Sequence, residues 1–166
     1  MKKILGWALF LLLCWNGWTQ NLSNYLKKFA PFAVQEMERT GIPASIKLGQ
    51  GILESSYGNS LLAQEANNYF GIKCGKDWSG PTFNHDDDRK GECFRKYDTP
   101  WHSFRDHSKF LKKPRYSRLF SLSRDDYKAW AKELKRAGYA TSGDYAERLI
   151  STIEENQLWR FDKINL

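Results

Sequence analysis

The residues best suited to do chemistry lie in the stretch Gln50–Gly58, where one carboxylate ends an apolar segment with helical spacing. Glu54 stands at that end, directly before Ser55 and Ser56. A carboxyl group at the boundary between core and cleft loses solvation of its charged form, so its pKa rises toward neutral pH. Such a group can donate a proton to a leaving oxygen, as a general acid does. The alternative is an ordinary solvated glutamate in the last turn of a helix.

Amide and aromatic side chains follow this segment. Asn68, Tyr69 and Phe70 precede a glycine, and Trp78 lies in a loop of glycine and serine where we expect it to be exposed. Amides hydrogen-bond sugar hydroxyls and acetamido groups, and aromatic faces stack on pyranose rings. A sugar-binding cleft is therefore one interpretation of these residues, and a place in the core is the alternative for Tyr69 and Phe70.

A second carboxylate is available further along the chain. Asp86, Asp87 and Asp88 form a consecutive run after a histidine, and Tyr139 follows a glycine at the end of a predicted helix. A second carboxylate beside a general acid can activate water or attack a sugar directly. A solvated run of charge and a calcium-binding turn are the alternatives for the aspartates. We expect the hydroxyl of Tyr139 to face a cleft.

The N-terminus predicts export. Met1–Lys3 is basic, and the apolar run Ile4–Leu13 that follows has the length of a signal peptide and is too short to span a bilayer. Gly17 and Thr19 supply small residues at the −3 and −1 positions of a cleavage site, so the mature chain would begin at residue 20.

Two alternatives stay open for this segment, namely a lipoprotein signal with Cys14 as the lipid acceptor and an uncleaved N-terminal anchor. All three predict a protein in the periplasm, cell envelope or extracellular space that meets the membrane only through this segment. We therefore separate a signal peptide at 1–19 from a single domain at 20–166, whose length suits one hydrophobic core.

The net charge of the chain and its distribution limit the classes of molecule that we expect it to bind. The formal net charge is +7, and Lys2 and Lys3 contribute two of these charges within the predicted signal peptide. Lys and Arg are interspersed with Asp and Glu along the chain instead of forming a basic stripe, and no nucleic-acid motif is present. This charge distribution and the predicted export both argue against a nucleic-acid partner. An anionic wall polymer and simple solubility remain as explanations of the charge.

The cysteines agree with export. Cys74 and Cys93 remain as a pair in the mature chain, and a disulfide is the default expectation in an oxidising compartment. It would close a loop of about twenty residues and stabilise the protein by roughly 3 kcal/mol. A zinc site is the competing interpretation, but His85 between them does not complete a ligand set.

The chain reads as mostly helical with one extended interruption. We predict helices over 22–39, with Ser23 or Asn24 as the cap and a restart at Pro31, and then over 43–53, 60–66, 104–111, 125–137 and 144–157. A further helix start is expected at Thr99 and Pro100. Trp130 and Trp159 are predicted in the core. The predicted fold class is α+β, with one helical body.

Glycine, proline and acidic residues break the helical period between residues 71 and 99. Phe83, Phe94 and Tyr97 fit short strands. This stretch is predicted to be a β-hairpin or irregular lobe held by the Cys74–Cys93 bond.

Several short motifs of the sequence occur in the order that is typical of a known family. Gln50–Ser55 is followed in order by Asn68–Lys73, Trp78–Gly80, Phe94–Tyr97 and Ala137–Thr141. This ordered set resembles the glucosaminidases of glycoside hydrolase family 73, including the peptidoglycan-hydrolase domain of flagellar muramidases. The resemblance runs from about residue 31 to residue 161.

The resemblance implies a lysozyme-like α+β fold with a small β-hairpin lobe over the cleft, and no metal ion or organic cofactor. It implies hydrolysis of the β-1,4 bond between N-acetylglucosamine and N-acetylmuramic acid in peptidoglycan by a protein that we expect to be monomeric. Glu54 matches the general acid, and Tyr139 matches a tyrosine near it. The predicted substrate-binding residues are Gln50, Asn68, Tyr69, Phe70 and Trp78.

The sequence departs from the family at the second carboxylate. Members often carry a glutamate in a Thr-x-Glu pattern, where this chain has Asp86, Asp87, Asp88 and Glu92. We rank Asp87 first, followed by Asp86. A muramidase, a lytic transglycosylase, a non-catalytic wall-binding module and a hydrolase of N-linked glycans are the alternative functions.

Overall fold

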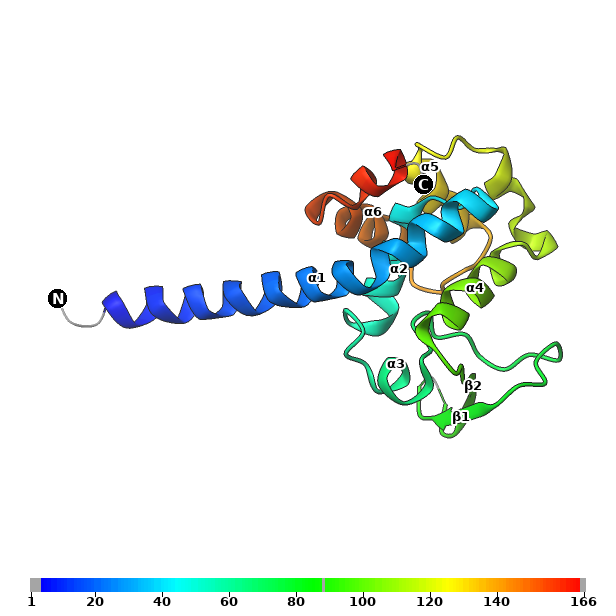
Figure 1. The fold of residues 1–166 in the computed structure, drawn as a ribbon, viewed down its shortest axis with the longest axis horizontal. Helices are drawn as coiled ribbons and strands as arrows, with labels where there is room; N and C mark the ends of the chain where they lie inside the picture. Colours follow the sequence, from blue (N-terminus) through cyan, green and yellow to red (C-terminus); the bar gives the residue numbers. More distant parts are fainter. Residues whose placement is uncertain (1–3, 88, 165–166) are drawn as a thin grey trace.

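The computed structural model describes residues 4–87 and 89–164, and the side chains of residues 21–87 and 89–164. Six α-helices, two strands and two 3-10 helices make up these described residues. α1 (Ile4–Thr40) projects its N-terminal half away from a body built by its C-terminal half and the other helices (Figure 1). No helix of the described residues is both long and apolar enough to cross a membrane.

The predicted cap at Ser23 or Asn24 and the restart at Pro31 are wrong, because α1 runs without interruption through all three. The preceding residues are themselves helical, so residue 23 or 24 has no helix end to cap. Proline inside a helix loses a hydrogen bond and costs about 3 kcal/mol. Phe29 and Val34, buried on either side of the proline, contribute apolar burial that offsets this cost.

α2 (Ala44–Ser55) is the central helix of the body, and ten of its twelve residues are buried. It contacts α1, α5, α6 and the 3-10 helix η2 (Leu158–Lys163). Its glycines permit this approach, since a Cβ on Gly49 would lie 2.8 Å from Leu149, and one on Gly51 would overlap the Tyr25 hydroxyl. The close packing of α2 therefore depends on two residues with poor helix propensity.

The local start signals for two helices are confirmed. Ser60 accepts a hydrogen bond from Ala63 at the start of α3 (Leu61–Ala66), and Thr99 caps α4 (Pro100–Leu111) with proline in its first turn.

The predicted helices near the C-terminus are present but shorter than expected. They are α5 (Tyr127–Arg136) and α6 (Tyr145–Glu155). The 3-10 helices η1 (Pro114–Ser121) and η2 were not predicted.

The two tryptophans predicted in the core differ. Trp130 is 1% exposed, whereas Trp159 is 39% exposed and the prediction is wrong there. Gln157, two residues after the end of α6, adopts the left-handed conformation, so the chain turns there and Trp159 lies in η2 instead of continuing α6.

The β lobe, residues 71–99, contains an antiparallel hairpin of β1 (Thr82–His85) and β2 (Glu92–Arg95). The predicted strand positions Phe83 and Phe94 face each other across it. The prediction for Tyr97 is wrong, because this residue follows β2 and is buried outside the sheet. Phe94 joins Leu62 and Ala66 in a small apolar cluster that anchors the hairpin to α3.

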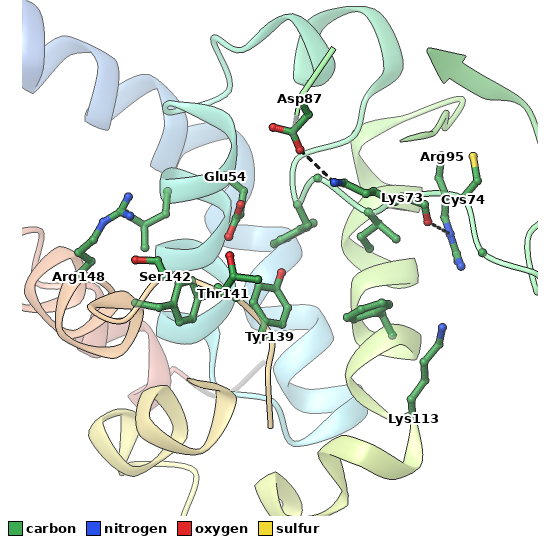
Figure 2. Close-up of a pocket in the computed structure, with 18 residues that line it drawn as sticks. Glu54, Lys73, Cys74, Asp87, Arg95, Lys113, Tyr139, Thr141, Ser142 and Arg148 are labelled. Atoms are coloured by element: carbon green, nitrogen blue, oxygen red, sulfur yellow. Dashed lines mark hydrogen bonds and ion pairs between the residues drawn. The ribbon is translucent and has the colours of Figure 1, made fainter. Parts of the chain in front are cut away.

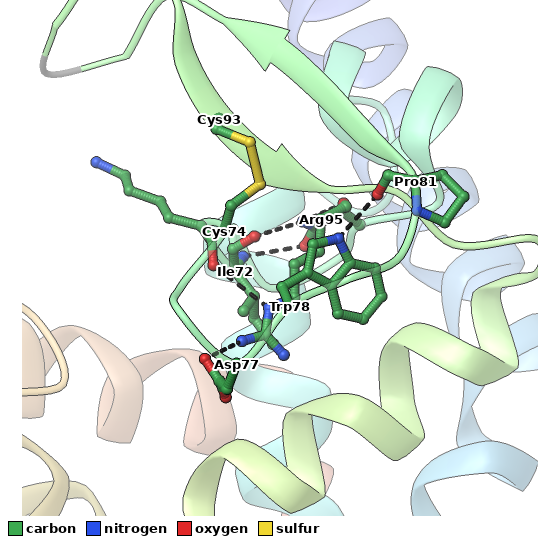
Figure 3. The surroundings of a disulfide bond; sticks show 9 residues. Ile72, Cys74, Asp77, Trp78, Pro81, Cys93 and Arg95 are labelled. Atoms are coloured by element: carbon green, nitrogen blue, oxygen red, sulfur yellow. Dashed lines mark hydrogen bonds and ion pairs between the residues drawn. A yellow bond between two sulfur atoms is a disulfide. The ribbon is translucent and has the colours of Figure 1, made fainter.

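The disulfide Cys74–Cys93 is present, with a Cα–Cα distance of 5.4 Å. It does not close the hairpin on itself, because Cys74 precedes β1 and lies beside β2 (Figure 3). The amide of Cys74 donates to the carbonyl of Cys93 at 2.8 Å, and that of Arg95 donates to Ile72 at 3.0 Å. The bond therefore holds the segment 71–75 against the hairpin.

Candidate active site

A cavity of about 540 Å³ opens between the C-terminal end of α2 and the β lobe. Glu54 projects into it from α2, residues 70–75 and Asp87 line it from the lobe side, and residues 139–142 and Arg148 line it from the opposite side. In Figure 2 the carboxylate of Glu54 points toward the 139–142 loop, while Asp87 lies on the far side of Glu54 from that loop. The volume lies in the range of small-molecule binding clefts.

Burial raises the pKa of Glu54 from 4.5 to about 7. The positive charge of Arg148 opposes this rise, and the negative charge of Asp87 adds to it. Glu54 is therefore largely protonated below neutral pH and about half protonated at pH 7, so the state that a general acid needs is populated there.

The chain turns sharply directly after Glu54. Ser56, Tyr57 and Gly58 all have positive φ, and the first two are conformations that cost about 1 kcal/mol or more for residues with a side chain. The Ser55 hydroxyl donates to the carbonyl of Gly51 and accepts from the amide of Gly58 at 2.8 Å. These bonds end α2 at a fixed point, which leaves the carboxylate at the cavity and its backbone in the core.

The described candidates for the second carboxylate take different positions. Asp87 lines the cavity and pairs with Lys73 at 3.3 Å. Asp86 instead accepts a bond from the backbone of the hairpin turn, and Glu92 binds the same lysine at 3.0 and 2.9 Å outside the cavity lining. Asp88 lies outside the described residues. Asp87 is therefore the candidate whose position suits a role beside Glu54.

Two tyrosines line the cavity, and each contacts a buried nitrogen behind it. The Tyr139 hydroxyl lies 3.3 Å from Nε2 of His107, and the Tyr145 hydroxyl accepts from Nε2 of Gln50 at 2.8 Å. Their rings stack with centroids 5.6 Å apart. Burial raises the pKa of Tyr139 well above its usual value, so its hydroxyl is protonated at neutral pH and can act as a donor.

Cations from outside the cavity hold the loop that carries Tyr139. Gly138 has a φ of +73°, which glycine adopts without cost. Arg115 donates to the carbonyls of Ala137 at 2.7 Å and Gly138 at 2.5 Å, and Lys135 donates to that of Thr141 at 3.2 Å. The loop is therefore held by its backbone, and its side chains face the cavity.

Several predicted substrate-binding residues do not line this cavity. Asn68 is fully buried and its amide nitrogen donates to Ile72 at 3.0 Å and Arg95 at 2.8 Å, because it completes the backbone hydrogen bonding of the β lobe. Gln50 is also fully buried, and Tyr69 is buried in the main core. These residues support the cavity without touching its interior.

Phe70 lines the cavity. The side chain of Trp78 lies elsewhere, donating to the carbonyl of Pro81 at 2.9 Å and covering the guanidinium of Arg95 at 4.9 Å (Figure 3). It borders two smaller cavities that lie between the β lobe and α4.

Comparison with known proteins decides the family. Residues 30–158 match the model of the glucosaminidase family, described as mannosyl-glycoprotein endo-beta-N-acetylglucosaminidase. The chain belongs to the glucosaminidase family.

Curated relatives of this glucosaminidase-family chain include two proteins named for their activity on glycans or the cell wall. The exo-glucosaminidase LytG of Bacillus subtilis is 35% identical over 140 residues, covering 77% of the chain and 49% of LytG. The peptidoglycan hydrolase FlgJ of Salmonella typhimurium is 30% identical over 145 residues, covering 80% and 45%. The chain thus spans about half the length of these relatives.

Solved structures agree on the fold. A peptidoglycan hydrolase from Sphingomonas sp. A1 superposes with a TM-score of 0.73 at 28% identity, covering 83% of this chain and 91% of that one. The glycoside hydrolase domain of Salmonella typhimurium FlgJ gives 0.68 at 27% identity, covering 82% and 88%. The predicted α+β class, with a helical body and a small β lobe, is confirmed.

The cavity is also lined by residues that the sequence analysis did not identify as candidates. Lys73, Arg95, Lys113 and Arg148 line it, and these four basic side chains are its positive rim. Three of them are also ion-paired, Lys73 with Asp87, Arg95 with Asp106 and Lys113 with Asp77. Charged residues are common on any surface, so nothing in their local sequence marked these four. Among the described residues, no three His, Cys, Asp or Glu side chains gather closely enough to hold a metal ion.

Proposed function

We propose that this glucosaminidase-family protein is an exported peptidoglycan hydrolase that cleaves the β-1,4 bond on the glucosamine side of the glycan. The observation that carries the proposal is the position of Glu54, whose carboxyl group has its pKa raised to about 7 inside a cavity that it shares with Asp87. The family match and the named activities of LytG and FlgJ point to the same class of reaction.

Glu54 would protonate the glycosidic oxygen as the bond to the sugar breaks. The charge that develops on the sugar ring is positive, and Asp87 is the carboxylate available to stabilise it, to activate water or to attack the sugar. The substrate's own acetamido group is the third possible nucleophile. The stereochemistry of the product distinguishes direct displacement by water from the two routes that retain configuration.

The positive rim supports a cell-wall substrate over a neutral glycan. Lys113 and Arg148 line the cavity, and Lys113 also pairs with Asp77 at 3.1 Å. Peptidoglycan carries carboxylates on its stem peptides, so cations at the rim would attract it and orient it. A neutral chitin-type oligosaccharide gains nothing from these charges.

The test is digestion of purified peptidoglycan by the full-length protein and by its Glu54→Gln variant. The products are reduced with borohydride and identified by mass spectrometry. We expect reduced N-acetylglucosamine ends from the wild type. The variant should be slower by about a hundred- to ten-thousandfold, because loss of a general acid removes about two to four orders of magnitude.

Other outcomes identify the alternatives. Reduced muramic ends would show a muramidase, and anhydro ends would show a lytic transglycosylase. Binding to peptidoglycan without turnover by the wild-type protein would show a binding module. Cleavage of N-linked glycans without cleavage of peptidoglycan would show a different substrate class.

A further inference from the structure

Behind Tyr139 lies a row of polar side chains that is enclosed by the core. Lys47 of α2 and His107 of α4 are both 0% exposed. Nζ of Lys47 lies 3.1 Å from Nδ1 of His107, and Nε2 of the same ring lies 3.3 Å from the Tyr139 hydroxyl. A continuous path of hydrogen-bonding atoms therefore connects the buried lysine with the cavity.

The direction of these hydrogen bonds follows from the donors available. Lys47 donates to the carbonyl of Phe104 at 2.9 Å. Burial lowers the pKa of Lys47 to about 7, so below that pH it is an ammonium, which can only donate to His107 as well. Burial, with the charge of Lys47, keeps the pKa of His107 well below its usual value, so the ring is neutral and carries one proton. With Nδ1 accepting from Lys47, that proton sits on Nε2.

The position of the His107 ring is also fixed. Phe70 lies parallel to it, with a centroid distance of 3.9 Å and an interplanar angle of 7°. Phe70 is itself part of the cavity wall. The imidazole therefore cannot turn to exchange its two nitrogens without moving that wall.

The buried lysine is not required to neutralise its acidic neighbour. Glu36 is buried nearby, but its carboxylate accepts two bonds from Arg39 at 2.8 and 2.6 Å and one from Ser108 at 2.5 Å. An apolar residue at position 47 would avoid the cost of burying an ammonium group. Its hydrogen bonds to the Phe104 carbonyl and to His107 are thus what distinguish Lys47 from such a residue, and of these only the bond to His107 leads to the cavity.

We propose that Lys47 and His107 are positioning residues, which hold the Tyr139 oxygen as a hydrogen-bond acceptor and so direct its O–H proton into the cavity. This inference rests on the proposed function, because it assigns Tyr139 as a donor to the glycan or to the Glu54 carboxylate. If His107 carried its proton on Nδ1 instead, Tyr139 would donate backward to Nε2 and offer the cavity only its lone pairs.

The first test reads the tautomer of His107 in the full-length protein by ¹⁵N NMR of the imidazole nitrogens. The chain has three histidines, so the His107 signals are assigned by their loss in a His107→Phe variant. At about pH 6, where Lys47 is an ammonium and His107 is neutral, we expect Nε2 protonated and Nδ1 unprotonated in the wild type. In Lys47→Met, Nδ1 loses its donor and we expect a shift toward the opposite tautomer. An Nδ1-protonated ring in the wild type would overturn the proposal.

Ser108→Ala is the matched control for Lys47→Met. It removes a buried hydrogen bond to Glu36 from the residue next to His107, without removing a partner of the imidazole. We expect it to lower stability and to leave the tautomer unchanged. A tautomer change as large as that of Lys47→Met would show that loosening of the core, and not the lysine donor, sets the proton.

The second test is a double-mutant cycle between His107→Phe and Tyr139→Phe, measured on peptidoglycan. His107→Phe keeps an aromatic ring against Phe70 and removes the donor. We expect it to lower kcat by about five- to tenfold, with a smaller change in KM, since one hydrogen bond is lost. In the Tyr139→Phe background it should lower kcat no further, whereas equal losses in both backgrounds would refute the proposal.

The two proposals fail separately. If the Glu54→Gln variant keeps full activity, the proposed function fails, while the tautomer of His107 can still be read without any turnover. If Glu54→Gln is inactive but the ring carries its proton on Nδ1, only the positioning role fails.

Discussion

A cavity that raises the pKa of Glu54 must also destabilise the folded protein at high pH. The unfolded chain has a carboxyl pKa near 4.5, and the folded chain has one of about 7. A raised carboxyl pKa means that the folded state binds more protons, so wild-type stability falls as pH rises from the lower value through the higher one. At 1.36 kcal/mol per unit, the full loss is about 3 kcal/mol above pH 8.

The perturbation that reveals this loss is Glu54→Gln, which is uncharged at every pH. We expect the variant to exceed the wild type in free energy of unfolding by about 3 kcal/mol at pH 8, and by less than about 0.5 kcal/mol at pH 4.5. Urea denaturation at both pH values measures this difference, and other titrating groups cancel in the comparison. An equal difference at both pH values would refute the raised pKa, since a pure packing effect of the amide does not depend on pH.

Three further predictions follow from named contacts. Gly51→Ala should cost about 1–3 kcal/mol of stability because its Cβ overlaps the Tyr25 hydroxyl, and Tyr25→Phe should restore part of it in urea denaturation. Arg148→Gln removes a charge that lowers the pKa of Glu54, so the alkaline limb of the pH–rate profile should move to higher pH. Reducing the disulfide, which joins residues 19 apart, should cost roughly 3 kcal/mol and lower activity before the helical body unfolds, as activity assays and circular dichroism would show.

The sequence located Glu54 because its signal is local: an apolar helical pattern that ends at a carboxylate and a turn. Tyr139 had a similar signal, as it follows a glycine at the end of a helix. The amide side chains of Gln50 and Asn68 had no such local signal, because the residues that they hydrogen-bond are distant in the sequence. Gln50 bonds to a tyrosine 95 residues away, and Asn68 bonds to Arg95 across 27 residues. Residue type alone does not separate an amide that faces a ligand from one that completes the backbone hydrogen bonding of its own protein.

The starts of helices were predictable where an N-cap residue marks them. The start of α1 and the two 3-10 helices were not predicted correctly. Ser60 and Thr99 are strong N-caps, and the helices begin after them. The start of α1 was predicted too late because Ser23 can lie inside a helix when the preceding residues are helical. The restart at Pro31 was predicted wrongly because tertiary packing tolerates a proline inside α1. The 3-10 helices were missed because their pattern is too short to have a period of its own.

One pattern in the sequence does connect the fold with the site. Lys47, Gln50 and Glu54 are spaced i, i+3, i+7, so they lie on one face of α2, amid residues that are otherwise small or apolar. The first reaches Tyr139 through His107, the second holds Tyr145, and the third enters the cavity itself. A buried helix with a polar stripe costs stability at each polar position. The tight contacts that Gly49 and Gly51 allow on α2 offset this cost, and they also fix the three side chains relative to one another. The same packing that makes α2 the centre of the core therefore aligns the candidate acid with both tyrosines.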